Sequence, residues 1–131
     1  FIIKDILQEA ARRGTAKNVS TLKRPDLAGK TGTTNEAEST WFTGFNDYLV
    51  TSVWVGFDQP KSLGSREFGS STALPIWIEF MESNLKDLPI NRSIQPEGLV
   101  SIKVNKTSGL RSVNDSSNSL FEYFLEEYVP E

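Results

Sequence analysis

The segment Ala28-Gly29-Lys30-Thr31-Gly32-Thr33-Thr34-Asn35 (AGKTGTTN) places one lysine, two glycines and three threonines side by side. Two kinds of site use such a string: a loop that wraps a phosphate, and a strand that lines a cleft for acyl transfer. A P-loop carries a glycine five residues before its Gly-Lys-Thr, but Arg24 holds that position here, and Pro25 beside it has no N–H group. Residues 36–40 also lead into predicted strands, whereas a P-loop is followed by a helix. The spacing therefore argues against a nucleotide site.

The alternative is that residues 27–33 form a strand at the edge of a sheet. Lys30 and Gly32 would then point to one face, and Thr31 and Thr33 to the other. An edge strand offers unpaired backbone groups to an extended peptide, and a glycine leaves room for its close approach. Threonine hydroxyls can donate to a carboxylate, and the lysine supplies positive charge. The pattern fits a peptide that ends in a free carboxylate, although an ordinary polar edge strand fits this short motif equally well.

The surrounding sequence predicts an α/β (α+β) fold, an antiparallel sheet flanked by helices. Residues 41–45 and 48–57 are rich in aromatic and β-branched side chains, and only Asn46-Asp47 separates them, which predicts a tight hairpin. We expect residues 27–33 to be the third strand, beside this hairpin. Apolar residues at helical spacing predict a first helix over residues 2–13, followed by a glycine.

The second half of the chain predicts one more helix and a small extension. Pro75 occupies a position that the first turn of a helix tolerates, and an apolar stripe follows it. Residues 100–104 alternate apolar and polar side chains as a strand does, and residues 120–128 predict a short closing helix. We therefore divide the chain into a domain over residues 1–90 and an extension over residues 91–131.

Composition excludes several function classes. The chain has no cysteine and no histidine, which rules out metal sites built on those ligands, a cysteine nucleophile and a histidine base. We expect no metal and no cofactor. The net charge of −3 and the lack of a basic cluster argue against nucleic acid as a partner. We expect Trp41, Trp54 and Trp77 to pack in the core, since they fall on predicted strand and helix faces.

Several further motifs carry a resemblance to a known family. They stand in a fixed order along the chain: RGTA (13–16), LAGKTGTTN (27–35), WFTGF (41–45), VWVGFD (53–58), ALPIW (73–77), PEGLVSIKVNKTSG (96–109) and FEYFLEEYVP (121–130). Together they resemble the C-terminal part of the transpeptidase domain of class A penicillin-binding proteins, whose fold is shared with serine β-lactamases. The resemblance implies an enzyme that cross-links peptidoglycan stem peptides ending in D-Ala-D-Ala through an acyl-enzyme and that β-lactams acylate. It also implies a parent that carries a glycosyltransferase domain and works at the periplasmic face of the cytoplasmic membrane, with the anchor outside this chain.

The resemblance also implies a role for each residue of the opening segment. Lys30 would be catalytic, assisting proton transfer and anchoring charge, while Thr31 and Thr33 would hold the substrate carboxylate. The N–H of Thr33 would be one catalytic donor of the oxyanion hole. Gly32 would clear space for the substrate, and Asn35 would lie at the mouth of the cleft.

The nucleophile that this family requires is a serine in a Ser-x-x-Lys motif, accompanied by a Ser-x-Asn motif. Chance matches occur at Ser20–Lys23 and Ser83–Lys86, and for the second motif at residues 112–114 and 116–118. We reject all four. The first motif must begin a buried helix that faces the cleft, and neither Ser20 nor Ser83 stands where such a helix is predicted. The two matches to the second motif follow Lys-Thr-Gly in a loop-like tail, whereas the family places that motif upstream. We therefore expect this chain, which begins at Phe1 without a methionine, to be an inactive fragment of the enzyme.

Two alternatives stay open at this stage. One is a non-catalytic module that binds cell-wall peptide or a partner protein. The other is a serine β-lactamase or a class B transpeptidase, both of which share Lys-Thr-Gly, although the run at residues 53–58 favours class A. We also expect the chain to self-associate. The resemblance implies a parent sheet of five antiparallel strands, and a three-stranded piece of it would leave the strand over residues 48–57 with an unpaired edge.

Overall fold

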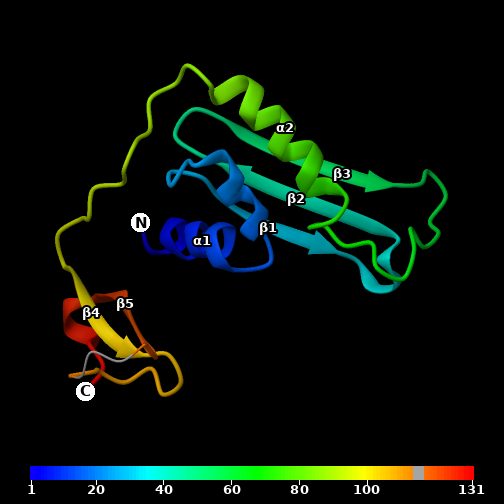
Figure 1. Cartoon of the computed structure of the whole chain (residues 1–131). Helices are drawn as coiled ribbons and strands as arrows, with labels where there is room; N and C mark the ends of the chain where they lie inside the picture. Colours follow the sequence, from blue (N-terminus) through cyan, green and yellow to red (C-terminus); the bar gives the residue numbers. More distant parts are fainter. Residues whose placement is uncertain (114–116) are drawn as a thin grey trace. The chain divides into compact units, whose positions relative to one another are not determined.

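The computed structural model describes residues 1–113 and 117–131, which form two compact units. One unit comprises Ile3–Ser93, and the other comprises Phe1–Ile2 with Ile94–Glu131. The division of the chain into two domains at residue 90 stays a prediction. The first unit contains nearly all of α1 (Ile2–Arg13), together with η1 (Lys17–Leu22), β1 (Ala28–Thr33), η2 (Asn35–Ala37), β2 (Ser39–Phe45), β3 (Val50–Gly56) and α2 (Ala73–Leu85) (Figure 1).

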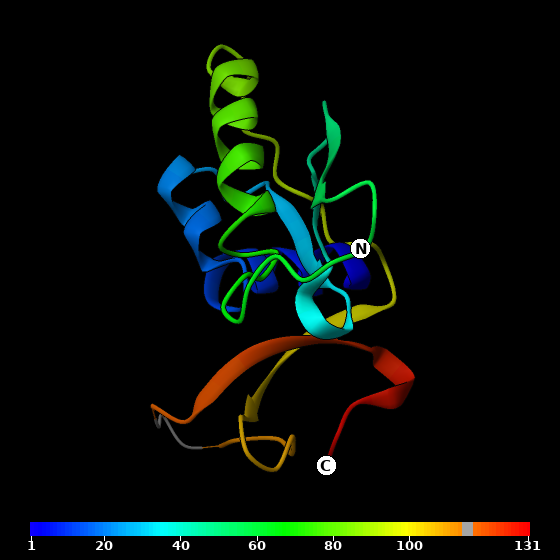
Figure 2. The same cartoon turned by 90° about the vertical axis from the view of Figure 1, so that its right-hand side faces the viewer.

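The sheet of the first unit confirms the predicted hairpin and third strand. Its order is β1-β2-β3, with both pairs antiparallel, so β1 and β3 are the two edge strands. α2 packs against β2 and β3 on one face of this sheet (Figures 1 and 2). The two predicted helices are also present, and Pro75 lies in the first turn of α2 as expected. Among the described residues, none of the helices is long and apolar enough to cross a membrane.

The loop between β2 and β3 differs from the predicted two-residue turn. It spans residues 46–49, and the N–H of Asn46 donates to the carbonyl of Leu49 at 3.0 Å. The side-chain Oδ1 of Asn46 accepts from the N–H groups of both Tyr48 and Leu49. An asparagine side chain that bonds nearby backbone groups in this way stabilises a wider loop, which the pattern of strand residues alone does not reveal.

The core lies between the sheet and α2. Trp77 and Phe42 are fully buried, with ring centroids 4.8 Å apart in an edge-to-face arrangement, and the indole N–H of Trp77 donates to the carbonyl of Thr51. Gly44 makes this contact possible, because a Cβ there would lie 2.5 Å from the Trp77 ring. The other buried apolar residues of this core are Ala11, Ala16, Val19, Leu27, Ala73, Leu74, Met81 and Leu85.

The expectation that all three tryptophans are core residues is wrong for two of them. Trp41 and Trp54 face each other across β2 and β3, with centroids 6.4 Å apart, and each is 44% exposed. Successive strand residues point to opposite faces. Because α2 covers the face that carries Phe42, its neighbour Trp41 lies on the uncovered face.

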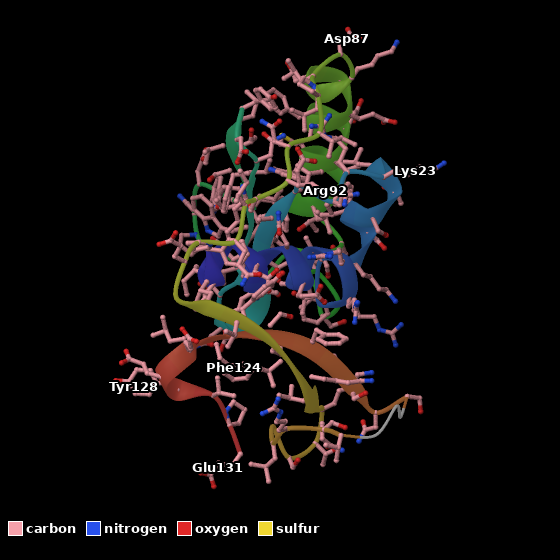
Figure 3. The ribbon with its side chains drawn as sticks, turned by 90° about the vertical axis from the view of Figure 1, so that its left-hand side faces the viewer. Lys23, Asp87, Arg92, Phe124, Tyr128 and Glu131 are labelled. Carbon is pink, nitrogen blue, oxygen red and sulfur yellow. The ribbon has the colours of Figure 1, made fainter. Side chains whose placement is uncertain are left out.

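The second unit is built on a two-stranded antiparallel ribbon. The predicted strand is present as β4 (Leu99–Asn105), but the predicted closing helix is wrong, since most of it is β5 (Ser119–Leu125). Only η3 (Glu126–Tyr128) is helical, with Tyr128 labelled beside Phe124 of β5 in Figure 3. The aromatic residues of this segment suit both a helical stripe and a strand, and pairing with β4 along its full length decides for the strand.

Candidate active site

The open edge of β1 carries the residues that the sequence singled out. A Cβ atom placed on Gly69 would contact the carbonyl oxygens of both Gly32 and Trp41. Because one atom reaches both, the two oxygens lie close together, so both point into the space between β1 and β2. Gly32 and Trp41 face each other in the register and therefore exchange backbone hydrogen bonds. The direction in which the backbone groups point alternates from residue to residue along β1. Thr31 and Thr33 consequently direct their N–H and C=O groups away from β2, toward the edge where no strand of the described chain is paired.

The side chain of Lys30 bends around this edge. Its Nζ donates to the carbonyl oxygen of Thr31 at 3.0 Å and to Thr31 Oγ1 at 3.3 Å. Alternation places the two side chains on opposite faces, yet the length of the lysine brings its ammonium to the threonine hydroxyl. A positive charge, a hydroxyl and free backbone N–H groups thus meet at one strand edge, which is the combination that binds an anionic peptide end.

Thr15 is a site neighbour that the sequence analysis did not select. It follows the end of α1, and its Oγ1 lies 3.0 Å from Thr31 Oγ1. The only signal in the sequence was its place in the RGTA motif, since a threonine after a helix-ending glycine is otherwise an ordinary loop residue. The two residues are 16 positions apart in the sequence, and the contact arises because the segment after α1 lies against β1.

Thr33 is tied to the loop between β3 and α2. The N–H of Gly69 donates to Thr33 Oγ1 at 3.2 Å, so the loop borders the candidate site. A hydroxyl has one donor hydrogen and two acceptor lone pairs, which leaves the hydrogen of Thr33 available to a ligand. Beside it is an open pocket of about 280 Å³. The residues that line it are Thr33, Thr34, Glu36, Ala37, Ser62, Gly64, Ser65 and Phe68.

Asn35 lies at the exposed turn that follows β1. Thr34 closes this turn, because its N–H donates to the carbonyl of Ser39 and its Oγ1 accepts from the N–H of Ser39. Glu36 and Ala37 have φ values of 63° and 53°, in the left-handed region that non-glycine residues seldom adopt. The structure thus places Asn35 beside the candidate site, and its role at the mouth of a cleft stays a prediction.

The rejected nucleophile motifs lie elsewhere. Ser20 Oγ donates to the carbonyl of Lys17 at 2.6 Å, while Lys23 extends outward from the segment after η1 (Figure 3). Ser83 Oγ donates to the carbonyl of Glu79 within α2. Both matches to the Ser-x-Asn motif include residues outside the described part, at 114 and 116. No group of acidic, histidine or cysteine side chains suited to a metal ion occurs in the parts of the chain that the structure describes.

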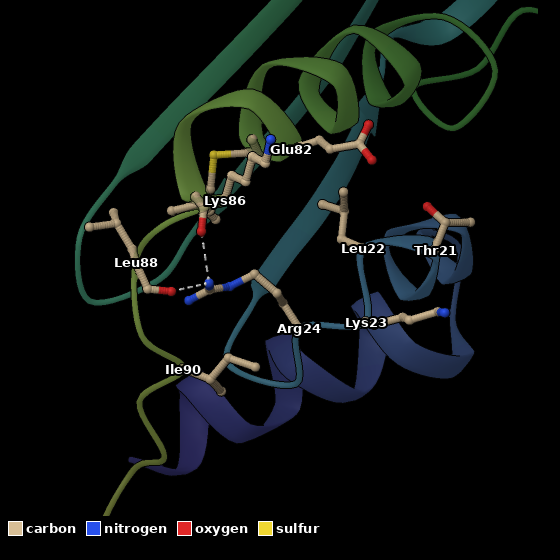
Figure 4. A pocket seen from close by; sticks show the side chains of 10 residues that line it. Thr21, Leu22, Lys23, Arg24, Glu82, Lys86, Leu88 and Ile90 are labelled. Atoms are coloured by element: carbon tan, nitrogen blue, oxygen red, sulfur yellow. Dashed lines mark hydrogen bonds between the residues drawn. The ribbon is translucent and has the colours of Figure 1, made fainter.

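A larger hollow of about 510 Å³ lies at the C-terminal end of α2 (Figure 4). Arg24 lies in its wall and uses all five of its N–H groups internally. Its guanidinium donates to both carboxylate oxygens of Asp26 and to the backbone carbonyls of Leu85, Leu88 and Pro89. Because the arginine has no donor left for a ligand, we assign it a structural role.

Comparison with known proteins identifies the relatives of this chain. No protein-family model matches it. It is 46% identical to penicillin-binding protein 1A of Pseudomonas aeruginosa over 130 residues, which are 99% of this chain. The chain is a homologue of penicillin-binding protein 1A. The counterpart from Neisseria lactamica is 45% identical over 76% of the chain.

A solved structure supports the same relationship. The crystal structure of penicillin-binding protein 1A from Haemophilus influenzae matches 98% of this chain with a TM-score of 0.88 and 34% identity. The match covers 20% of that structure, and the chain spans 16% of the Pseudomonas protein. The resemblance seen in the sequence to penicillin-binding proteins is thereby confirmed, as is the fold of helices around an antiparallel sheet.

Proposed function

We propose that this chain forms one wall of the active site of a serine-type D,D-transpeptidase that cross-links peptidoglycan and is acylated by β-lactams. One observation carries the proposal: the open edge of β1 gathers the Lys30 ammonium, the Thr31 hydroxyl and the outward N–H of Thr33. Homology to penicillin-binding protein 1A supports the family of reactions.

In this reaction, a serine hydroxyl outside the described chain attacks the carbonyl between the two D-alanines of a stem peptide. The Thr33 N–H donates to the oxyanion, and the Lys30 ammonium with the Thr31 and Thr33 hydroxyls holds the terminal carboxylate. The peptide C–N bond breaks, D-alanine leaves with a proton on its nitrogen, and an amine of a second stem peptide takes the acyl group from the serine. Gly32 leaves space beside the strand, and Asn35 borders the entrance.

The setting follows from the same proposal. The partners are stem peptides ending in D-Ala-D-Ala and β-lactams, and the reaction takes place at the periplasmic face of the cytoplasmic membrane. The enzyme also carries a glycosyltransferase domain. Since the two Ser-x-x-Lys matches have their serine hydroxyls engaged with backbone carbonyls, this chain alone should form no covalent adduct with penicillin. Intact-protein mass spectrometry after incubation with penicillin measures this directly.

The test uses a full-length penicillin-binding protein 1A whose matching segment is this chain. Lys30→Ala should lower the second-order rate constant of labelling by fluorescent penicillin at least tenfold, since charge at the site stabilises the bound anion and the transition state. Lys23→Ala is the matched control, because it removes an exposed lysine that lies outside β1, directly after η1, and should leave the rate unchanged. Thermal melting of both variants should stay near that of the parent.

An unchanged labelling rate for Lys30→Ala would contradict the proposed role of the β1 edge. A protein that binds D-Ala-D-Ala peptide but is never acylated would instead support the alternative of a non-catalytic binding module.

A further inference from the structure

The hydroxyls of Thr15 and Thr31 form a pair at the candidate site, and their hydrogens can be counted. An ammonium only donates, so Thr31 Oγ1 accepts from Lys30 Nζ at 3.3 Å. Between the two threonines, whose Oγ1 atoms are 3.0 Å apart, one hydroxyl donates and the other accepts. Whichever is the donor, the pair uses one of its two hydrogens internally and keeps one for a ligand.

The identity of the free hydrogen depends on the direction of that bond. If Thr31 donates to Thr15, the free hydrogen belongs to Thr15, at the end of a chain that starts at the Lys30 ammonium. If Thr15 donates, Thr31 keeps its hydrogen and its oxygen accepts twice. In either arrangement, the free hydrogen binds an anion more strongly than a neutral ligand, because hydrogen bonds to a charged acceptor are the stronger ones.

The backbone around Thr15 is held firmly. The N–H groups of Gly14 and Ala16 donate to the carbonyl of Ala10 at 3.1 and 3.3 Å, which closes the end of α1. Ala16 is fully buried in the core, while Thr15 itself is exposed. The hydroxyl is thus presented to Thr31 by a fixed segment, as a residue that orients a ligand group must be.

We propose that Thr15 is a third hydroxyl of the carboxylate-binding edge, acting on the terminal carboxylate of the peptide or β-lactam together with Thr31 and Lys30. This inference rests on the proposed function and extends it to a residue on a different element, the segment between α1 and η1. Thr15 is a specificity-determining residue: it favours ligands that carry a free carboxylate over ligands in which that group is neutral.

The experiment compares two forms of one inhibitor in a full-length penicillin-binding protein 1A whose matching segment is this chain. Penicillin carries the free carboxylate, and its methyl ester does not. Thr15→Val removes the hydroxyl at nearly constant volume, and Thr15→Ser keeps it. Thr21→Val is the matched control, since Thr21 is an exposed threonine of η1 whose Oγ1 donates to the carbonyl of Asn18 at 2.8 Å, outside the β1 edge.

We expect Thr15→Val to lower the acylation rate constant for penicillin about tenfold, the size expected for losing a hydrogen bond to a charged group. Its effect on the methyl ester should be less than about twofold, and Thr15→Ser should restore the rate with penicillin. Thr21→Val should change neither rate.

The outcomes separate this inference from the proposed function. If the parent protein is not labelled by penicillin, the proposed function is overturned, and the inference with it. If the parent is labelled and Thr15→Val slows penicillin and its ester equally, Thr15 has only a structural role and the inference alone is overturned. An unchanged penicillin rate for Thr15→Val overturns it as well.

Discussion

Replacing Arg24 by methionine should be among the most destabilising single changes in this chain. The side chain of Arg24 is 10% exposed, and that of its partner Asp26 is 1% exposed. The pair is closed by two hydrogen bonds, at 2.8 and 3.1 Å, and the amide of Asn46 donates to the same carboxylate at 3.1 Å. Figure 4 shows two of the three further bonds, from the guanidinium to the carbonyls of Leu85 and Leu88.

The magnitude follows from what the substitution leaves behind. Arg24→Met keeps the apolar length of the side chain but leaves the Asp26 carboxylate buried, with the Asn46 amide as its remaining side-chain donor among the described residues. Removing one partner of a buried ion pair costs about 3–5 kcal/mol, and carbonyls at the end of α2 also lose their donors. Because a domain of this kind is stable by only about 5–15 kcal/mol, the variant should lose a large share of its free energy of unfolding.

Two further variants make the reasoning refutable. Arg24→Met combined with Asp26→Asn removes the stranded charge and should recover part of the loss, about 1–2 kcal/mol. Arg12→Met is the matched control, since Arg12 pairs with Glu9 at 3.2 Å on the surface and should matter by less than about 1 kcal/mol. The assay is urea unfolding followed by tryptophan fluorescence. A loss for Arg24→Met no larger than that for Arg12→Met would show that the pair does not stabilise the fold as described.

Three other predictions follow from the structure. Gly44→Ala should reduce stability by about 1–3 kcal/mol in urea unfolding, because its Cβ would overlap the Trp77 ring. The hydrogen bond from Lys4 lowers the pKa of Asp47, so the stability it contributes is present above the ordinary carboxyl pKa and is lost as the pH falls through the lowered pKa. Lys4→Met should therefore raise the pKa of Asp47 in an NMR titration, and an unmoved pKa would exclude this cause. The chain should self-associate through β3 in light scattering across a dilution series, and Val50→Lys, at a position that is 75% exposed, should reduce this association.

The sequence predicted those elements whose local pattern agrees with their packing. The strand over residues 27–33, the hairpin beside it and the two helices were all recognisable, because periodicity, glycine and proline point the same way at each. The apolar residues of the segment 120–128 fit the spacing of a helix and also that of a strand, and only pairing with β4 selects the strand. Likewise, the alternation of side chains along a strand places Trp41 and Phe42 on opposite faces of the sheet, but it does not say which face α2 covers.

The candidate site shows the same limit. The Lys-Thr-Gly-Thr motif directed attention to β1, because the types and spacing of its residues carry the chemistry. The contacts of Thr15 with Thr31, and of Gly69 with Thr33, join positions that are distant in the chain. Such contacts arise because the segment after α1 and the loop between β3 and α2 lie against the sheet, which no local pattern records.

The most direct test of the proposed site is a crystal structure of the penicillin adduct of a full-length penicillin-binding protein 1A whose matching segment is this chain. The proposal predicts that the carbonyl oxygen of the opened lactam accepts from the N–H of Thr33. It also predicts that the penicillin carboxylate lies within hydrogen-bond distance of the Lys30 ammonium or the hydroxyls of Thr31 and Thr33. An adduct whose carboxylate lies away from the open edge of β1, with the Thr33 N–H turned from the acyl oxygen, would contradict it.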